Sequence, residues 1–200
     1  MSHQAPQPGG GFLLIISGPS GVGKSTITNA VREVLDADLS ISMTTRPKAN
    51  GDAEGEHYHF VNRERFEQAI EGNELLEWAQ MYGNYYGTPR GPVNERLARG
   101  RIVILEIDAK GAEQVKRNMP GAFAVFILAP SEEALLNRLR TRKREDEATI
   151  QLRYSRARSE IEEAKSSRVY DAFIINDDLD RAVNEVVDLV RAEMRRRRSA

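Results

Sequence analysis

Apolar and polar residues follow one another in blocks that indicate buried strands separated by amphipathic helices. Four short apolar runs, at 12–16, 101–108, 122–128 and 172–176, are typical of strands that are buried on both faces. Between them the apolar residues recur at helical spacing, as Ile27, Val31 and Val34 do. Strands alternating with helices predict an α/β domain with a largely parallel sheet covered by helices on both faces.

The remaining segments predict smaller elements. The stretch 40–62 is polar and contains Pro47, Gly51 and Gly55, so it predicts a loop with a short strand near its end. The stretch 73–87 predicts two strands joined by a Gly-Asn turn. Residues 1–11 are rich in Pro, Gly and Gln and predict a disordered tail. Helices are expected over 25–35, 63–72, 93–100, 131–142, 145–168 and 179–194.

Composition excludes several classes of function. The chain has no cysteine, which rules out disulfides, thiolate catalysis and thiolate metal sites and favours a reducing compartment. A formal net charge of −1 gives no general attraction to nucleic acid or to a membrane. The N-terminus lacks the features of a signal peptide, and the apolar runs are too short to span a bilayer. We expect a cytoplasmic protein, in which the arginines at 195–198 form a solvated helix end.

A phosphate-binding loop lies between the first strand and the first helix. The pattern GxxxxGK[ST] is formed by Gly18, Pro19, Ser20, Gly21, Val22, Gly23, Lys24 and Ser25, followed by Thr26. Glycines let backbone N–H groups approach phosphate, and the N-terminus of the following helix favours an anion. Lys24 is expected to reach the β- and γ-phosphate oxygens, and the Ser25 hydroxyl suits Mg²⁺. The loop predicts a bound nucleoside triphosphate.

An acidic residue at the end of the second buried strand is the expected partner of this loop. Asp108 ends the run 101–108, and Glu106 lies two residues earlier on the same strand face. Such a carboxylate acts on Mg²⁺, here through water, when it lies at the carboxyl edge of the sheet. The alternative is that Asp108 only caps the helix that follows it.

Other segments resemble the guanylate kinase family, in the family's order, from about residue 12 to 190. They are ISGPSGVGKST, SISMTTR (40–46), GEHYHFV (55–61), LLEWAQMYGNYYGTP (75–89), ILEIDAKGA (104–112), RLRTR (138–142) and INDDLDRA (175–182). The resemblance implies a P-loop NTPase-type sheet with nucleoside-monophosphate-kinase architecture, transferring the γ-phosphoryl group of ATP to GMP and dGMP. Within a domain over 12–200, it implies a core (12–42, 91–137, 169–195), a GMP-binding region (43–90) and a lid (138–168).

The same resemblance assigns the GMP site. Guanine would be read by Ser42, Glu77, Thr88 and Asp108. The chemistry agrees, because a carboxylate can accept from both guanine N1 and N2 while a hydroxyl donates to O6, and a different base would leave buried polar groups unpaired. The GMP phosphate would bind Arg46, Tyr58 and Tyr86, which offer a guanidinium fork and neutral hydroxyl donors.

The resemblance also assigns the groups that act on ATP. Arg138, Arg142 and Arg153 of the lid, with Lys24 and Arg46, would surround the moving phosphoryl group with positive charge. Asn176 and Asp177 fall in the adenine-contacting motif, although NDD before a helix also suits N-capping. For Arg140, Arg144, Arg156 and Arg158 a solvated helix surface is the simpler interpretation.

Two positions depart from the family pattern. Where a second arginine usually follows the TTR segment by three residues, this chain has Ala49, with Lys48 beside it. Either Lys48 substitutes as a point charge, or GMP binds more weakly; we expect the weaker binding. Lys143 stands where the family has glycine after the lid arginine, which leaves the lid geometry open.

Two other functions remain compatible with parts of the pattern. A guanylate-kinase-like scaffold module would bind phosphopeptides without catalysis, but such modules typically lack a working phosphate loop. A ribose 1,5-bisphosphate kinase would share the core but not the guanine-reading set. The patterns leave open whether the protein forms a homo-oligomer.

Overall fold

The central layer of the computed structural model, which describes residues 10–81, 83–141 and 146–199, is a five-stranded parallel sheet. The strand order is β2-β7-β1-β8-β9. The strands are β1 (Phe12–Ser17), β2 (Asp38–Leu39), β7 (Ile102–Glu106), β8 (Phe123–Leu128) and β9 (Ala172–Ile175), each parallel to its neighbours. All four predicted strands are present, but the predicted burial on both faces is wrong for β9, an edge strand in which Phe173 and Ile175 are 37% and 45% exposed. Strand β2 is an additional short strand at the other edge.

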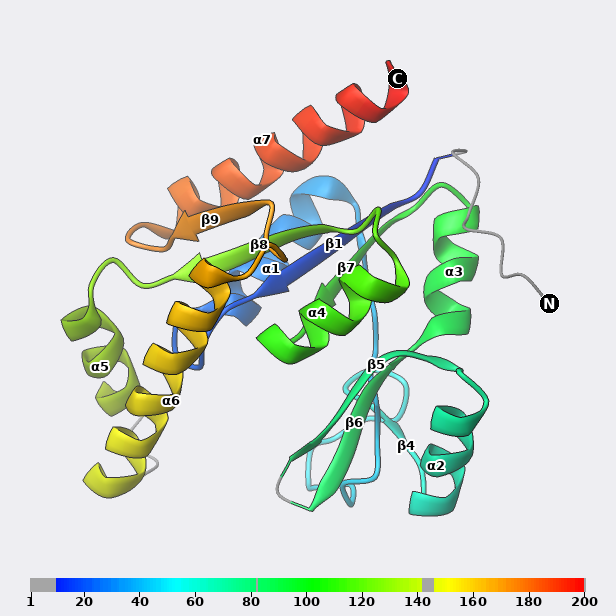
Figure 1. Ribbon diagram of the computed structural model, residues 1–200, viewed down its shortest axis with the longest axis horizontal. Coiled ribbons are helices and arrows are strands. Elements are labelled where there is room, and N and C mark those ends of the chain that lie inside the picture. The colour runs from blue at the N-terminus through cyan, green and yellow to red at the C-terminus, as the bar shows by residue number, and fades with distance from the viewer. Residues whose placement is uncertain (1–9, 82, 142–145, 200) are drawn as a thin grey trace.

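Helices cover both faces of this sheet (Figure 1). On one face lie α1 (Lys24–Leu35) and α7 (Leu179–Arg198), and on the other α3 (Arg90–Ala98) and α4 (Ala109–Asn118). Alternate residues of β1 point to opposite faces, so Leu14 packs with α1 and α7 while Leu13 packs with α3 and α4. The predicted α/β class, with a parallel sheet between two helical layers, is confirmed.

A second, smaller sheet lies beside the core and is formed by residues between β2 and α3 (Figure 1). Its order is β4-β3-β6-β5, with β6 antiparallel to both neighbours and β3 parallel to β4. The strands are β3 (Met43–Thr44), β4 (His59–Phe60), β5 (Leu75–Met81) and β6 (Asn84–Pro89). Helix α2 (Arg63–Glu71) buries Phe66 and Ala69 against Met43 and Leu75. This sheet falls within the predicted region 43–90.

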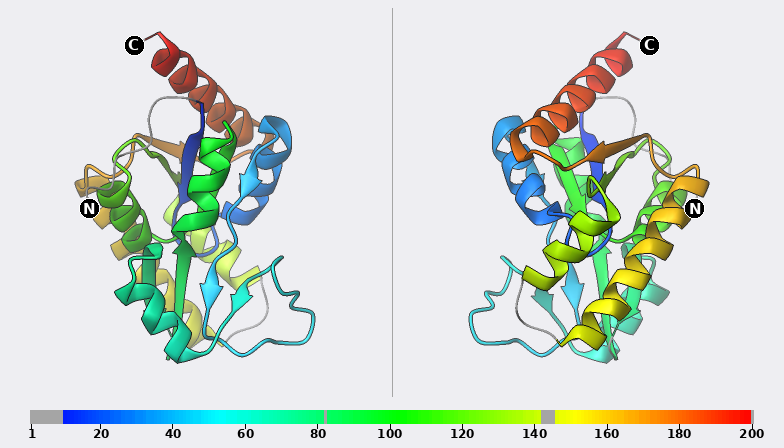
Figure 2. Two further views of the ribbon diagram at one scale, coloured as in Figure 1. Left: turned by 90° about the vertical axis from the view of Figure 1, so that its right-hand side faces the viewer. Right: turned by 90° about the vertical axis from the view of Figure 1, so that its left-hand side faces the viewer.

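Two helices, α5 (Glu132–Thr141) and α6 (Glu147–Ser166), pack against each other and project from the same side of the core as the small sheet, at the left of Figure 1 where the small sheet is at the right (Figures 1 and 2). Ser131, which begins the predicted helix 131–142, caps α5 by accepting a hydrogen bond from the Ala134 N–H (3.0 Å). Asp146 caps α6 by accepting from the Thr149 N–H (2.7 Å). Arg142 and Lys143, like most of the tail at 1–11, lie outside the described residues.

Two helices differ from the sequence-based expectation. The sequence pattern does not predict helix α4, which follows β7 directly: its apolar residues are few, and of these Ala112 and Val115 are buried. Helix α7 runs on to Arg198 because Glu193 binds both Arg196 (2.7 Å) and Arg197 (2.8 Å). These arginines lower the pKa of Glu193 to about 2, so the basic run is a paired, solvated helix end. In the described part of the chain, no helix is long and apolar enough to cross a membrane.

Candidate active site

The loop between β1 and α1 has the backbone that phosphate binding needs. Gly18, Gly21 and Gly23 have φ values of 146°, 91° and 95°, which favour glycine. A Cβ at Gly18 would lie 2.5 Å from the Ile127 carbonyl oxygen, so this position also has no room for a side chain. No side chain caps the start of α1, and its first N–H groups are therefore available to an anion.

Lys24 lies over this loop. Its ammonium group donates to the carbonyl oxygens of Gly18 (2.5 Å) and Pro19 (3.0 Å). These bonds hold the positive charge where the loop glycines and the helix N-terminus converge. The site is therefore electropositive and built for an anionic ligand.

The carboxylate that is hydrogen-bonded to the loop is that of Glu106. The Ser25 hydroxyl donates to Glu106 Oε1 (2.6 Å), which joins the start of α1 to the end of β7. Asp108 instead accepts from the Gly111 N–H (2.8 Å) and caps α4. Asp108 thus has the capping role given above as the alternative, while its role at Mg²⁺ through water stays a prediction, and Glu106 is the acid that Ser25 contacts directly.

The arginines of α5 and α6 reach the same loop. Arg138 donates to the carbonyl oxygens of Val22 (3.3 Å) and Asn176 (2.7 Å). Arg153, from α6, is hydrogen-bonded to the Ser20 hydroxyl. Two of the three predicted lid arginines are therefore in contact with the loop or its neighbour, while Arg142 is outside the described residues.

Asn176 and Asp177, which follow β9, make different contacts. The Asn176 side chain is buried and donates to the Val22 carbonyl oxygen (2.7 Å), which ties the end of β9 to the phosphate loop. Asp177 is exposed and accepts from Arg181 (2.9 Å). The residue that caps α7 is Asp178, whose side chain accepts from the Arg181 N–H (2.9 Å).

A buried pair of polar residues lies in the small sheet. Glu77 on β5 faces Thr88 on β6, and the Thr88 hydroxyl donates to Glu77 Oε1 (2.5 Å). They are 6% and 1% exposed. Burial raises the pKa of Glu77 to about 7; the Thr88 hydrogen bond opposes this rise, and the charge of Asp108 adds to it.

Glu77 also approaches the core. A Cβ on Gly111 would lie 3.0 Å from Glu77 Oε2 and 3.3 Å from Asp108 Oδ1, so both carboxylates converge on this glycine of α4. Ser42 directly precedes β3, and its carbonyl oxygen accepts from the His59 N–H (2.8 Å). The residues predicted to read guanine thus come from four elements or their ends, and Gly111 is an addition that the motif did not single out.

The residues predicted to bind the GMP phosphate are also together. The Arg46 guanidinium lies 5.4 Å from the centroid of the Tyr58 ring, and the rings of Tyr58 and Tyr86 are 5.9 Å apart. Burial raises the pKa of Tyr58, so this phenol stays a neutral donor.

Asp52 is the residue of this cluster that sequence reasoning missed. Its carboxylate binds Arg46 (2.9 Å) and accepts from the Ala49 N–H (2.7 Å). These contacts lower the pKa of Asp52, the Ala49 N–H most of all. The pKa of Glu54 is lowered chiefly because it accepts from the Phe60 N–H (3.0 Å), and the charge of Lys48 contributes least to this shift.

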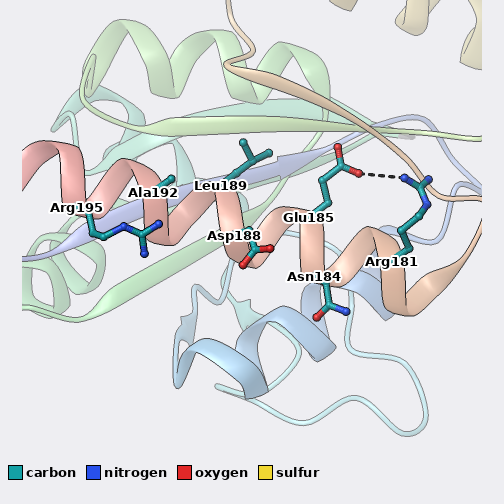
Figure 3. Close-up of a pocket in the computed structure, with 7 residues that line it drawn as sticks. All are labelled: Arg181, Asn184, Glu185, Asp188, Leu189, Ala192 and Arg195. Carbon is teal, nitrogen blue, oxygen red and sulfur yellow. Dashed lines mark hydrogen bonds and ion pairs between the residues drawn. The ribbon is translucent and has the colours of Figure 1, made fainter.

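A broad, open hollow on the opposite side of the core does not compete with this site. It is lined by α7 side chains between Arg181 and Arg195, among them the ion pair of Arg181 with Glu185 at 3.3 Å (Figure 3). All the lining residues come from one helix, and none belongs to the predicted set. The surface therefore lacks the second wall that a ligand pocket needs.

Comparisons with known proteins agree with this geometry. The family model described as guanylate kinase matches residues 11–193. A guanylate kinase of Carboxydothermus hydrogenoformans is 49% identical over 185 residues, which cover 92% of this chain and 89% of that protein. One from Prochlorococcus marinus (strain MIT 9313) is 46% identical, covering 90% and 94%. The crystal structure of guanylate kinase from Anaplasma phagocytophilum superposes with a TM-score of 0.72 at 31% identity, covering 92% and 86%.

Proposed function

The chain belongs to the guanylate kinase family, and on this premise we propose that it catalyses the ATP-dependent phosphorylation of GMP to GDP with the residues described above. The observation that carries the proposal is the buried pair of Glu77 and Thr88, which faces Asp108 across Gly111. A phosphate loop alone would fit many nucleotide-binding proteins. A buried carboxylate with a hydroxyl beside it matches the hydrogen-bonding edge of guanine.

Guanine recognition follows from the donors and acceptors at this edge. Ionised Glu77 accepts from the N1 and N2 hydrogens, and Thr88 turns its hydroxyl to O6, with Ser42 and Asp108 completing the set. Adenine presents an acceptor at N1 and a donor at C6, so it would leave these buried groups unpaired. The site selects guanine by the cost of these unmade bonds.

The GMP phosphate binds Arg46, Tyr58 and Tyr86. The Arg46 guanidinium supplies charge and a fork of donors, and the neutral tyrosine hydroxyls add donors without further charge. Because the acceptor phosphate must attack the γ-phosphorus of ATP in line, this cluster aligns the nucleophile. Ala49 leaves the cluster without the family's second arginine, which supports a higher KM for GMP.

On the ATP side, backbone N–H groups of the loop 18–26, in which only Pro19 has none to donate, cradle the phosphates. Lys24 moves its ammonium group from its carbonyl partners to phosphate oxygens. The hydroxyl of Ser25 and the carboxylate of Glu106 are hard oxygen donors 2.6 Å apart, which fits a site for Mg²⁺. When bound, Mg²⁺ neutralises charge on the transferring phosphates. Asn176 and Asp177 border the adenine site, where Asn176 also fixes Val22.

Residues 138–168 act as a lid, and 43–90 as the GMP-binding region. Arg138, Arg142 and Arg153 stabilise the charge that develops on the transferred phosphoryl group, and closure excludes water that would otherwise hydrolyse ATP. dGMP is also a substrate, because the guanine and phosphate contacts make no use of the 2′-hydroxyl. A cytoplasmic location fits a protein that draws on the cellular pools of ATP and GMP.

A coupled assay of ADP release tests this function. The purified chain is given ATP and Mg²⁺ with GMP, dGMP, AMP, CMP or UMP, one at a time. We expect turnover with GMP and dGMP and at most about a hundredth of that efficiency with the others, because unpaired buried polar groups discriminate strongly. Turnover of AMP or UMP in preference to GMP, or of no nucleotide, contradicts the proposal.

A further inference from the structure

Two side chains of α4 occupy the unpaired edge of β5. In the strand order β4-β3-β6-β5, strand β5 is at the edge, so one side of its backbone has no strand partner. The Gln114 amide donates to the Trp78 carbonyl oxygen (2.9 Å) and accepts from the Trp78 N–H (3.2 Å). The Asn118 amide donates to the Leu76 carbonyl oxygen (2.7 Å). Figure 1 shows α4 and β5 meeting where the small sheet joins the core.

These hydrogen bonds lie on either side of Glu77, the residue proposed to bind guanine. Leu76 and Trp78 are the chain neighbours of Glu77, and their backbone groups point to the edge opposite the one that pairs with β6. Glu77 is therefore held on both sides: its own carboxylate accepts from Thr88 on β6, and the peptide groups next to it bind α4.

The same helix also positions the second guanine-facing acid. Asp108 is the N-cap of α4, and Gly111, one turn along, lies against the Glu77 carboxylate. Gln114 and Asn118 follow at helical spacing from Gly111 and share its face. One rigid helix thus fixes the distance between Asp108 and the strand that carries Glu77.

We propose that Gln114 and Asn118 are positioning residues for base selection: they lock β5 to α4 so that Glu77 can accept from both guanine N1 and N2. The inference rests on the proposed GMP kinase activity and adds residues that do not touch the substrate. The N1 and N2 hydrogens of guanine are fixed relative to each other and both bind the Glu77 carboxylate. A shift of a few tenths of an ångström in β5 therefore leaves one of these hydrogen bonds intact and weakens the other, the one to N2. Loosening this contact lowers discrimination for the 2-amino group more than it lowers binding of the phosphate.

The variants are Gln114→Leu and Asn118→Leu, each of which removes amide hydrogen bonds while keeping good helix propensity. Glu113→Gln is the matched control, because Glu113 lies on the same helix and only pairs with the exposed Arg117 (3.9 Å). Each variant is assayed with GMP and with IMP, which carries the same phosphate and N1 hydrogen but lacks the 2-amino group. Trp78 is the single tryptophan of the chain, so its fluorescence reports directly on the β5 edge.

For Gln114→Leu we expect the KM for GMP to rise about tenfold, because both hydrogen bonds to Trp78 are lost. The KM for ATP should change less than about twofold, because these bonds are remote from the triphosphate. The preference for GMP over IMP should fall about fivefold, and the Trp78 emission should shift to the red. Asn118→Leu loses one hydrogen bond, so its KM for GMP should rise about threefold and its preference for GMP over IMP should fall about twofold. Glu113→Gln should match the wild type.

An unchanged ratio of GMP to IMP efficiency in folded Gln114→Leu and Asn118→Leu overturns the inference, even if both KM values rise together. If Gln114→Leu does not fold, Asn118→Leu decides by the same ratio. A wild-type enzyme that fails to phosphorylate GMP would instead refute the proposed function, and the two failures are thereby distinguished.

Discussion

Lowering the pH from 8 to 6 should weaken GMP binding through Glu77. The pKa of this carboxyl is raised to about 7, chiefly because it is buried in the small sheet. Only the ionised carboxylate can accept from both N1 and N2 of guanine, so GMP binds the deprotonated form. Protonation of Glu77 therefore competes with GMP.

The magnitude follows from the fraction of ionised Glu77. The apparent dissociation constant rises by 1 + 10^(pKa − pH), which for a pKa of about 7 is about 1.1-fold at pH 8, about twofold at pH 7 and about elevenfold at pH 6. The KM for GMP should thus rise about tenfold between pH 8 and pH 6. The KM for ATP contains no such contribution, because Glu77 does not face the phosphate loop.

The assay needs a control for the GMP phosphate, whose own second pKa of about 6 also titrates. Glu77→Gln supplies it, since this variant keeps the phosphate site and removes the titrating carboxyl. Its KM for GMP at pH 8 should be about 100-fold above wild type, because an amide cannot accept from both donors and loses charge-assisted bonds. The ratio of the two KM values across pH then isolates Glu77.

The same substitution has an opposite effect on stability. The folded-state pKa of about 7 exceeds the ordinary value of 4.5, so between these pH values the folded state binds more protons and stability falls as the pH rises. At pH 8 the ionised group costs about 3 kcal/mol, which Glu77→Gln should largely recover as a higher Tm. If wild type and Glu77→Gln show parallel pH profiles for GMP, Glu77 does not titrate as argued.

Three further predictions concern other parts of the molecule. Ala49→Arg should lower the KM for GMP about three- to tenfold with little change in kcat, measured in the coupled assay, and an unchanged or raised KM would contradict it. Glu106→Gln removes the negative charge beside Ser25, so it should lower kcat at least about 100-fold and raise the Mg²⁺ concentration needed for half-maximal rate. Full activity in this variant would exclude Glu106 from the magnesium site. Asp171→Ala should lower the free energy of unfolding by about 1–2 kcal/mol in urea while leaving kcat intact, since Asp171 accepts from the Ala124 N–H and from Lys116 at 2.7 Å each.

The core of the fold could be predicted because its signal is local. A parallel strand covered on both faces is one continuous apolar run, as in β1, β7 and β8. The edge strand β9 is an equally apolar run although only one of its faces is buried. The phosphate loop is equally local, because its backbone conformation depends on glycines at fixed spacing. Helix α4 is harder to predict because it contains Gly111 and few apolar residues, although Ala112 and Val115 do lie on one buried face.

Several features of the site depend on contacts between segments that are distant in the sequence. Both Glu106 and Asp108 satisfied the rule of an acid near a strand end, and only the packing of α1 against β7 brings Glu106 to Ser25. Gln114 hydrogen-bonds Trp78 across 36 residues of sequence. Such pairs leave no pattern in a single chain, because an exposed amide on a helix is ordinary wherever it does not meet a strand edge.

In the free protein, the Arg46 side chain that would bind phosphate is already bonded to protein oxygens. This explains why an arginine at position 49 would change GMP binding. The guanidinium of Arg46 bonds Asp52 (2.9 Å) and the Pro47 carbonyl oxygen (3.1 Å), so an arriving phosphate must share or displace an anionic partner. Asp52 stays close because the Ala49 N–H binds it. A second guanidinium at position 49 would give the phosphate a fork of donors that Asp52 does not already use. Since this gain is present as soon as GMP binds and the fork does not touch the transferring group, Ala49→Arg should act on KM and not on kcat.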